Sequence, residues 1–91
     1  MFTGIIETVG EVEQIKKEGN NIIFTIKSKI SCELKIDQSL SHDGVCLTVV
    51  EKTESTHSVV AIKETSLKSN VKEWKVGTLI NLERAMKLGD R

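Results

Sequence analysis

A thiol and a hydroxyl lie two positions apart in one stretch of this sequence, as the side chains of Cys46 and Thr48. Residues 43–49 begin with the turn pair Asp-Gly and continue as a predicted strand. Side chains alternate between the two faces of a strand, so Cys46 and Thr48 share one face and the aliphatic residues beside them share the other. Ser39 lies a few residues upstream. We therefore expect one face of this strand to join the core and the other to form a small polar site.

The same residues also have ordinary structural roles. Cys46 could be a small buried apolar side chain rather than a reactive thiol. Thr48 suits any strand, because β-branched residues favour extended structure. Ser39 could be a turn hydroxyl. The residue types alone leave a polar site and a purely structural strand both open.

The histidines and cysteines are not spaced as metal ligands. His42 and His57 are far apart, and neither has a second ligand at metal-site spacing. Cys32 and Cys46 form neither a metal knuckle nor a disulfide framework. We expect free thiols and no metal. We also expect His42 to be solvent-exposed in its turn, with a role as a base as the alternative, and His57 to lie on the surface.

Composition excludes several classes of partner. The chain has 91 residues and a net charge of zero, from 13 basic and 13 acidic residues, so no basic surface for nucleic acid or anionic membranes is expected. Its aromatic residues are too few to stack on bases; they are Phe2, Phe24 and Trp74. No apolar run approaches the roughly 20 residues of a membrane span. We expect a soluble, cytoplasmic protein with one domain, residues 1–91.

Alternating hydrophobicity predicts a series of short strands. Residues 5–15 read as a long first strand, in which Gly10 marks a bulge or a close backbone approach. The turn at residues 17–20 makes a hairpin with the next strand. Residues 28–38 are less regular and suggest a helical turn followed by an extended segment. The remaining predicted strands cover residues 22–27, 45–52, 57–63 and 79–83.

One short helix is predicted after the fifth strand. Thr65 or Ser66 can cap it, and Leu67, Val71 and Trp74 have the spacing of one apolar stripe. With about six short strands and no proline, the pattern favours a small closed antiparallel barrel over an open sheet, because closure removes exposed edges.

Four motifs in register make the chain resemble a known family. They are residues 1–6 (MFTGII), the segment 39–49 with its DGVCLT core, the KET run at 63–65, and the VG pair at 76–77 followed by NLERA at 81–85. Their order and spacing are similar to those of the N-terminal half of riboflavin synthase, and the resemblance covers the whole chain. The family is the suspected identity of this sequence.

The resemblance implies a fold, an activity and partners. The fold is an all-β, six-stranded antiparallel Greek-key barrel with one short helix, and residues 1–91 are the first of two such barrels in tandem. The activity is that of a transferase that needs no cofactor: two 6,7-dimethyl-8-ribityllumazine molecules give riboflavin and a ribitylaminopyrimidine. The catalytic cavity lies against the C-terminal barrel of a neighbouring subunit in a trimer. The isolated barrel is expected to bind lumazine or riboflavin, to be inactive alone, and to pair as a homodimer as one alternative.

The resemblance also implies which residues form the half-site. Ser39 and Cys46 match polar residues near the reacting centre. The substrate-binding segments are Gly4, Ile5 and Ile6; Cys46, Leu47 and Thr48; and Val60, Ala61, Ile62, Lys63, Glu64 and Thr65. An exposed charged pair at a strand end is the plain alternative for Lys63 with Glu64.

Two other functions compete with the enzyme. The family has non-catalytic relatives that hold a lumazine or flavin as a light-emitting antenna, and these tend to lose the polar centre. Ser39 and Cys46 are both present here, which favours the enzyme. The third alternative is a barrel that only mediates assembly, which would bind no ligand.

Overall fold

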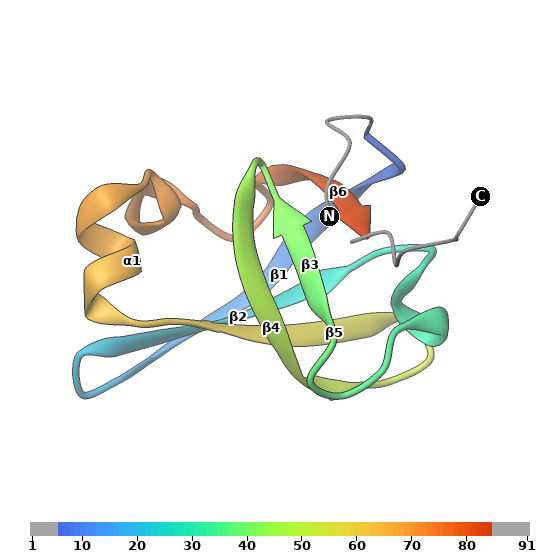
Figure 1. The fold of residues 1–91 in the computed structure, drawn as a ribbon, viewed down its shortest axis with the longest axis horizontal. Coiled ribbons are helices and arrows are strands. Elements are labelled where there is room, and N and C mark those ends of the chain that lie inside the picture. The colour runs from blue at the N-terminus through green and yellow to red at the C-terminus, as the bar shows by residue number, and fades with distance from the viewer. Residues whose placement is uncertain (1–5, 85–91) are drawn as a thin grey trace.

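A computed structural model describes residues 6–84 of the chain. The strands are β1 (Thr8–Glu18), β2 (Asn21–Lys27), β3 (Ser39–His42), β4 (Val45–Lys52), β5 (Thr56–Ala61) and β6 (Leu79–Arg84). The helix α1 (Lys63–Lys68) follows β5, and two single 3-10 turns, η1 (Ser31–Glu33) and η2 (Val71–Glu73), lie in the longer connections. Figure 1 shows α1 beside one end of the barrel. No helix among residues 6–84 is long and apolar enough to cross a membrane.

The strands close into an antiparallel barrel in the order β1-β2-β5-β4-β3-β6. β3, β4 and β5 are consecutive hairpin-connected strands, and β6 returns through the connection that carries α1 and η2 to pair with β3. This arrangement is a Greek key. The expected closed six-stranded barrel with one short helix is confirmed.

The barrel interior is filled by the inward residues of the strands, as the alternation predicts. In β4, Leu47 and Val49 are buried while Cys46 and Thr48 are exposed. Trp74 closes one side of the core and packs edge-on against Phe24, with ring centroids 4.9 Å apart. The buried hydrophobic residues are Val12, Phe24, Ile26, Ile30, Leu34, Leu40, Leu47, Val49, Val59, Ala61, Val71, Trp74, Ile80 and Leu82.

Gly10 is a place of close backbone approach, one of the two alternatives that its position suggested. A Cβ at Gly10 would lie 2.7 Å from Ile26 Cγ2 and 2.9 Å from Leu82 Cδ1. The irregularity in the β1–β2 register instead falls between Val12 and Gln14. Gly10 therefore lets β1 pack tightly over its neighbours, and the bulge lies farther along the strand.

Three predicted boundaries differ in the structure. The first strand was predicted over residues 5–15, whereas in the described part of the chain it runs from Thr8 to Glu18. The helix begins at Lys63, so the fifth strand ends earlier than expected and neither Thr65 nor Ser66 is its cap. The prediction that Leu67 belongs to a buried apolar stripe was wrong, because its side chain is 67% exposed. The backbone becomes extended at Ser69, so the helix ends before it reaches Val71 and Trp74.

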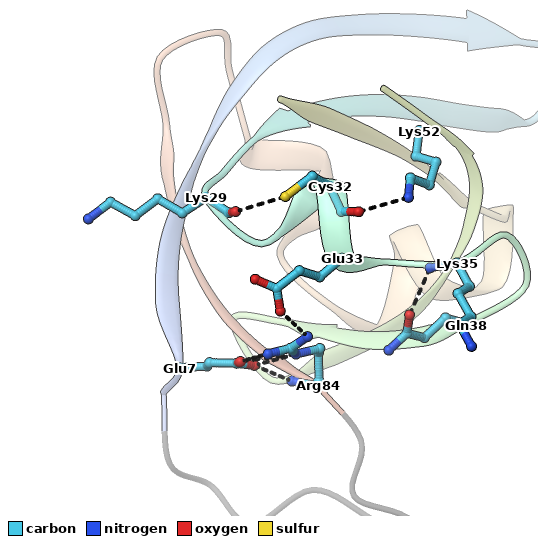
Figure 2. Close-up of polar contacts among 8 residues, drawn as sticks. All are labelled: Glu7, Lys29, Cys32, Glu33, Lys35, Gln38, Lys52 and Arg84. Carbon is cyan, nitrogen blue, oxygen red and sulfur yellow. Dashed lines mark hydrogen bonds and ion pairs between the residues drawn. The ribbon is translucent and has the colours of Figure 1, made fainter. Parts of the chain in front are cut away.

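Charged side chains hold one end of the barrel together (Figure 2). The Arg84 guanidinium donates two 3.0 Å hydrogen bonds from Nε to the Glu7 carboxylate, with a further contact from Nη2. Its Nη1 donates to Glu33 Oε1 at 3.0 Å. On the same side, Lys52 Nζ donates to the carbonyl oxygen of Cys32 at 3.0 Å. The end of β6 is thereby tied to the segment before β1 and to η1.

Candidate functional site

The turn between β3 and β4 sets the register of the polar site. Asp43 and Gly44 both have positive φ, 53° and 85°. Such a pair is typical of the two-residue hairpin turn that fits twisted strands. The Asp43 carboxylate also accepts a 2.7 Å hydrogen bond from the backbone N–H of Asn81, which ties the turn to β6. The turn itself and its hydrogen bond to β6 therefore both fix the register of this hairpin.

This register brings the predicted polar residues together on the outer face of the barrel. Ser39 lies opposite Thr48, and Ser41 lies opposite Cys46. Residues directly opposite in an antiparallel pair have Cβ atoms about 5 Å apart. Cys46 and Thr48 are exposed, and Ser39 is half-buried. Hydroxyls and a thiol from two neighbouring strands thus form one patch.

Ser41 belongs to the same patch, and sequence reasoning missed it. It is 6% exposed and also lies opposite Glu83 of β6. The signal that could have found it was its spacing of two from Ser39, once β3 was recognised as a strand.

The ladder between β4 and β5 is incomplete next to this patch, and we call the unpaired stretch between the two strands the opening. β4 and β5 pair at Val49 with Val59 and continue toward Lys52 with His57, with a bulge between Val49 and Glu51. No register pairs are found between the two strands on the other side of Val49, among the described residues. Residues 45–48 pair with β3 and residues 60–61 with β2, so on the side of the opening their backbone polar groups have no partner strand. The carbonyl oxygen of Ile62 accepts a 3.0 Å hydrogen bond from the backbone N–H of Ser66. Backbone groups without a partner strand can donate to and accept from the edge of a heterocycle.

The third predicted segment forms the opposite side of the opening. Val60 points outward and is half-buried, while Ala61 is fully buried in the core. Ile62 is 50% exposed and precedes the first turn of α1. Ala61 is therefore placed to act only through its backbone, whereas Val60 and Ile62 present apolar surface beside the opening.

The charged end of this segment lies on α1. Lys63 and Glu64 are exposed, and Thr65 is half-buried. Glu64 pairs with Lys68 at 3.2 Å in the surface-exposed manner expected of a solvated charged pair. The partner of Glu64 is thus Lys68, one helical turn away, rather than the neighbouring Lys63.

The first predicted segment lies almost outside the described residues. Gly4 and Ile5 are not described, and Ile6 is 47% exposed just before β1. Leu47, from the second segment, is 4% exposed and points into the core. A contact of Leu47 with a ligand at the outer face is therefore limited to its backbone.

Both histidine predictions were wrong. His42 and His57 are completely buried, and their Nε2 atoms lie 3.0 Å apart inside the barrel. Burial, and for His42 also the proximity of His57, lowers the pKa of His42 to about 3, and burial lowers the pKa of His57 to about 4. Each ring finds its polar partner on a distant strand, so the local turn context that suggested exposure was misleading.

The two cysteines are free thiols, as expected, and both are exposed. A hollow on the outer face lies beside the paired half of β4 and β5, over Thr25, Val50, Glu51 and Ser58. None of the predicted site residues lines it.

Comparison with known proteins identifies the family. Residues 3–85 match the model of the lumazine binding domain. Riboflavin synthase of Bacillus subtilis (strain 168) is 39% identical over 100% of this chain and 43% of its own length. Riboflavin synthase of Brucella abortus (strain 2308) is 35% identical over 99% of this chain and 48% of its own length. The chain spans less than half the length of these relatives.

Solved structures share the fold. The crystal structure of LumP complexed with 6,7-dimethyl-8-(1'-D-ribityl) lumazine superposes with a TM-score of 0.87, at 24% identity, over 98% of this chain and 50% of that one. The complex of LumP with riboflavin gives a TM-score of 0.85 over 98% of this chain and 51% of that one. At this identity the likeness concerns the fold. Because the family model spans nearly the whole sequence, the chain belongs to the lumazine binding domain family.

Proposed function

We propose that this chain is the N-terminal barrel of a riboflavin synthase and that it binds one lumazine or riboflavin molecule. The observation that carries the proposal is the outer patch of Ser39, Cys46 and Thr48 next to the opening between β4 and β5. The riboflavin synthase relatives that match the chain over its full length support the enzyme family. The bound molecules named for the solved neighbours support the class of ligand.

The ligand ring lies flat over the opening in this proposal. Backbone groups of residues 45–48 and 60–62 read the polar edge of the pyrimidine, and Val60 and Ile62 contact its apolar part. The ribityl chain is contacted by three residues at the start of α1, which are Lys63, Glu64 and Thr65. Residues 4–6 supply the remaining contacts, with Gly4 allowing close backbone approach.

The reaction requires a second ring that faces the first. One lumazine donates a four-carbon unit to the other, which leaves riboflavin and a ribitylaminopyrimidine, and no cofactor takes part. Holding both rings in attack geometry can supply on the order of 7–11 kcal/mol. The facing wall belongs to the C-terminal barrel of a neighbouring subunit in a trimer, and Ser39 and Cys46 lie near the reacting centre. The missing pairing between β4 and β5 beside this patch supports a half-site of this kind.

An enzyme assay tests the proposal directly. We expect the 91-residue chain to show little or no formation of riboflavin from 6,7-dimethyl-8-ribityllumazine, and the two-barrel protein to turn over. Cys46→Ser in the two-barrel protein is expected to slow the reaction. Robust turnover by the isolated chain would contradict the half-site, and normal turnover by the Cys46 variant would remove the thiol from the mechanism.

A non-catalytic antenna protein is the second candidate, and the LumP structures support it through their bound ligands. Both candidates predict ligand binding by this barrel. They differ in the two-barrel protein, which forms riboflavin if it is the enzyme and only binds its ligand if it is the antenna. The retained Ser39 and Cys46 favour the enzyme.

A further inference from the structure

Trp74 is a buried tryptophan whose indole N–H makes no hydrogen bond. Its side chain is 5% exposed, and Nε1 has no hydrogen-bond partner in the part of the chain that the structure describes. The Ser66 hydroxyl, whose oxygen is also buried and without a partner, does not accept this proton. A buried donor without an acceptor costs free energy, so most such groups in folded proteins are paired. The indole N–H is therefore a donor that an acceptor from outside the chain would satisfy.

The ring neighbours of Trp74 place it behind the opening. Its ring centroid lies 4.9 Å from that of Phe24 and 6.5 Å from that of His42. Phe24 on β2 pairs with Val59, the residue of β5 at which the ladder with β4 stops. His42 on β3 pairs with Val45, the first residue of β4. The indole thus lies inside the barrel between β2 and β3, and the two strands that border the opening, β5 and β4, stand between these in the barrel order.

Few side chains separate the opening from the indole. The inward residues beside the opening are Leu47 of β4 and Ala61 of β5, and both belong to the same buried cluster as Trp74. Ala61 contributes only a methyl group. The backbone groups at both edges of the opening have no partner strand. A polar atom that enters the opening from outside therefore meets backbone groups at its edges and the indole on its inner side.

We infer that the Trp74 indole N–H donates a hydrogen bond to the ligand, which accepts it with a carbonyl oxygen of its pyrimidine ring placed in the opening. This role depends on the proposed location of the ligand site. Lumazine and riboflavin both carry carbonyl oxygens on this ring, and a carbonyl oxygen only accepts. A ligand that lacks an acceptor there leaves the buried donor unpaired, so Trp74 is a specificity-determining residue for the heterocycle.

NMR spectroscopy of the 91-residue chain tests the contact. The chain has a single tryptophan, so its indole N–H gives one resonance. Riboflavin is expected to shift this resonance together with the backbone amides of residues 45–48 and 60–62. The amide of Val12, which is fully buried on β1, is the internal reference and should keep its position. Shifts at the opening with a stationary indole resonance would overturn the inference.

An isosteric replacement separates a donor to the ligand from a donor that serves the fold. β-(3-Benzothienyl)alanine at position 74 keeps the shape of the side chain and puts sulfur in place of the N–H. We expect its riboflavin affinity, measured by quenching of riboflavin emission, to fall roughly three- to tenfold. Without ligand, its urea midpoint by circular dichroism should equal or exceed that of the wild type, because an unpaired buried donor is gone. A lower midpoint with unchanged affinity means that the N–H binds an ordered water only, and contradicts the inference.

Two genetic variants control for packing. Trp74→Phe removes the donor and part of the ring, whereas Val71→Ala weakens the packing of the same connection and removes no polar group, since Val71 is fully buried in η2. We expect Trp74→Phe to lose at least as much riboflavin affinity as the isostere, and Val71→Ala to stay within about threefold of the wild type. An equal loss in Val71→Ala would contradict a role for the donor. If Trp74→Phe does not fold, the isostere decides.

The NMR titration also distinguishes this inference from the proposed function. If riboflavin shifts no resonance of the wild-type chain, the proposed function fails and the role of Trp74 fails with it. If the shifts are confined to the backbone of residues 45–48 and 60–62, the proposed function stands and the role of Trp74 alone is refuted.

Discussion

Acid is expected to destabilise this barrel through its two buried histidines. Burial holds the pKa of His42 at about 3 and that of His57 at about 4, compared with 6.5 for an ordinary histidine. Below pH 6.5 the unfolded chain therefore binds protons that the folded chain does not bind. The stabilisation from neutral burial is fully present above that pH and is lost as the pH falls toward the folded pKa values.

The size of this effect follows from the pKa of the unfolded chain. At about pH 5, protonation of one exposed imidazole favours the unfolded state by roughly 2 kcal/mol relative to about pH 7. Two histidines give about 4 kcal/mol, a large part of the roughly 5–15 kcal/mol that stabilises a typical domain. The result depends little on the folded values, since both lie below this range. Glu7, whose pKa the Arg84 guanidinium lowers from 4.5, loses its stabilising contribution only at lower pH.

Urea unfolding followed by tryptophan emission measures the effect. Trp74 is the single tryptophan of the chain and is 5% exposed, so its emission reports loss of the core. The free energy of unfolding should fall by about 4 kcal/mol from about pH 7 to about pH 5 in the wild type, and by about half as much in His57→Gln. A wild-type change below about 1 kcal/mol, or an unaltered pH dependence in the variant, would refute the reasoning.

Three further predictions concern single residues. Gly10→Ala should lower the free energy of unfolding by about 1–3 kcal/mol in urea titrations, because its Cβ meets Ile26 and Leu82 at under 3.0 Å; an unchanged value would mean that β1 shifts freely. Arg84→Lys should cost about 1 kcal/mol and lose most of its effect at high salt, since lysine cannot make the paired contacts to Glu7; a salt-independent loss would contradict this. In the same alkylation reaction, riboflavin should protect Cys46 and leave Cys32 reactive; equal protection of both thiols would speak against the site.

Local sequence patterns predicted the strand that carries the site. The alternation in β4 correctly placed Leu47 in the core and Cys46 outside, because a period of two needs no knowledge of the rest of the fold. Gly10 was correctly taken as a possible point of close approach, since a glycine inside a strand has few other uses.

Long-range contacts account for the failures. The burial of His42 and His57 depends on a hydrogen bond across the barrel and on Ser31, which no local window contains. Leu67, Val71 and Trp74 have the spacing of one helical face, but the helix ends at Lys68, so the three residues do not share a helix. The opening beside β4 exists because the ladder with β5 stops at Val49 and Val59. The position of this stop depends on how the whole barrel closes and cannot be read from either strand alone.

The central claim is that a flat heterocycle binds over the outer face of β4 beside this opening. A riboflavin fluorescence titration of three forms of the 91-residue chain tests it most directly: wild type, Thr48→Arg and Val9→Arg. Thr48 and Val9 are both exposed strand positions, and Val9 lies on β1, across the closed barrel from β4. We predict quenching at micromolar concentrations by the wild type and by Val9→Arg, and a loss of roughly tenfold or more in affinity for Thr48→Arg. Unchanged riboflavin emission with the wild type, or equal binding by the two variants, would contradict the claim.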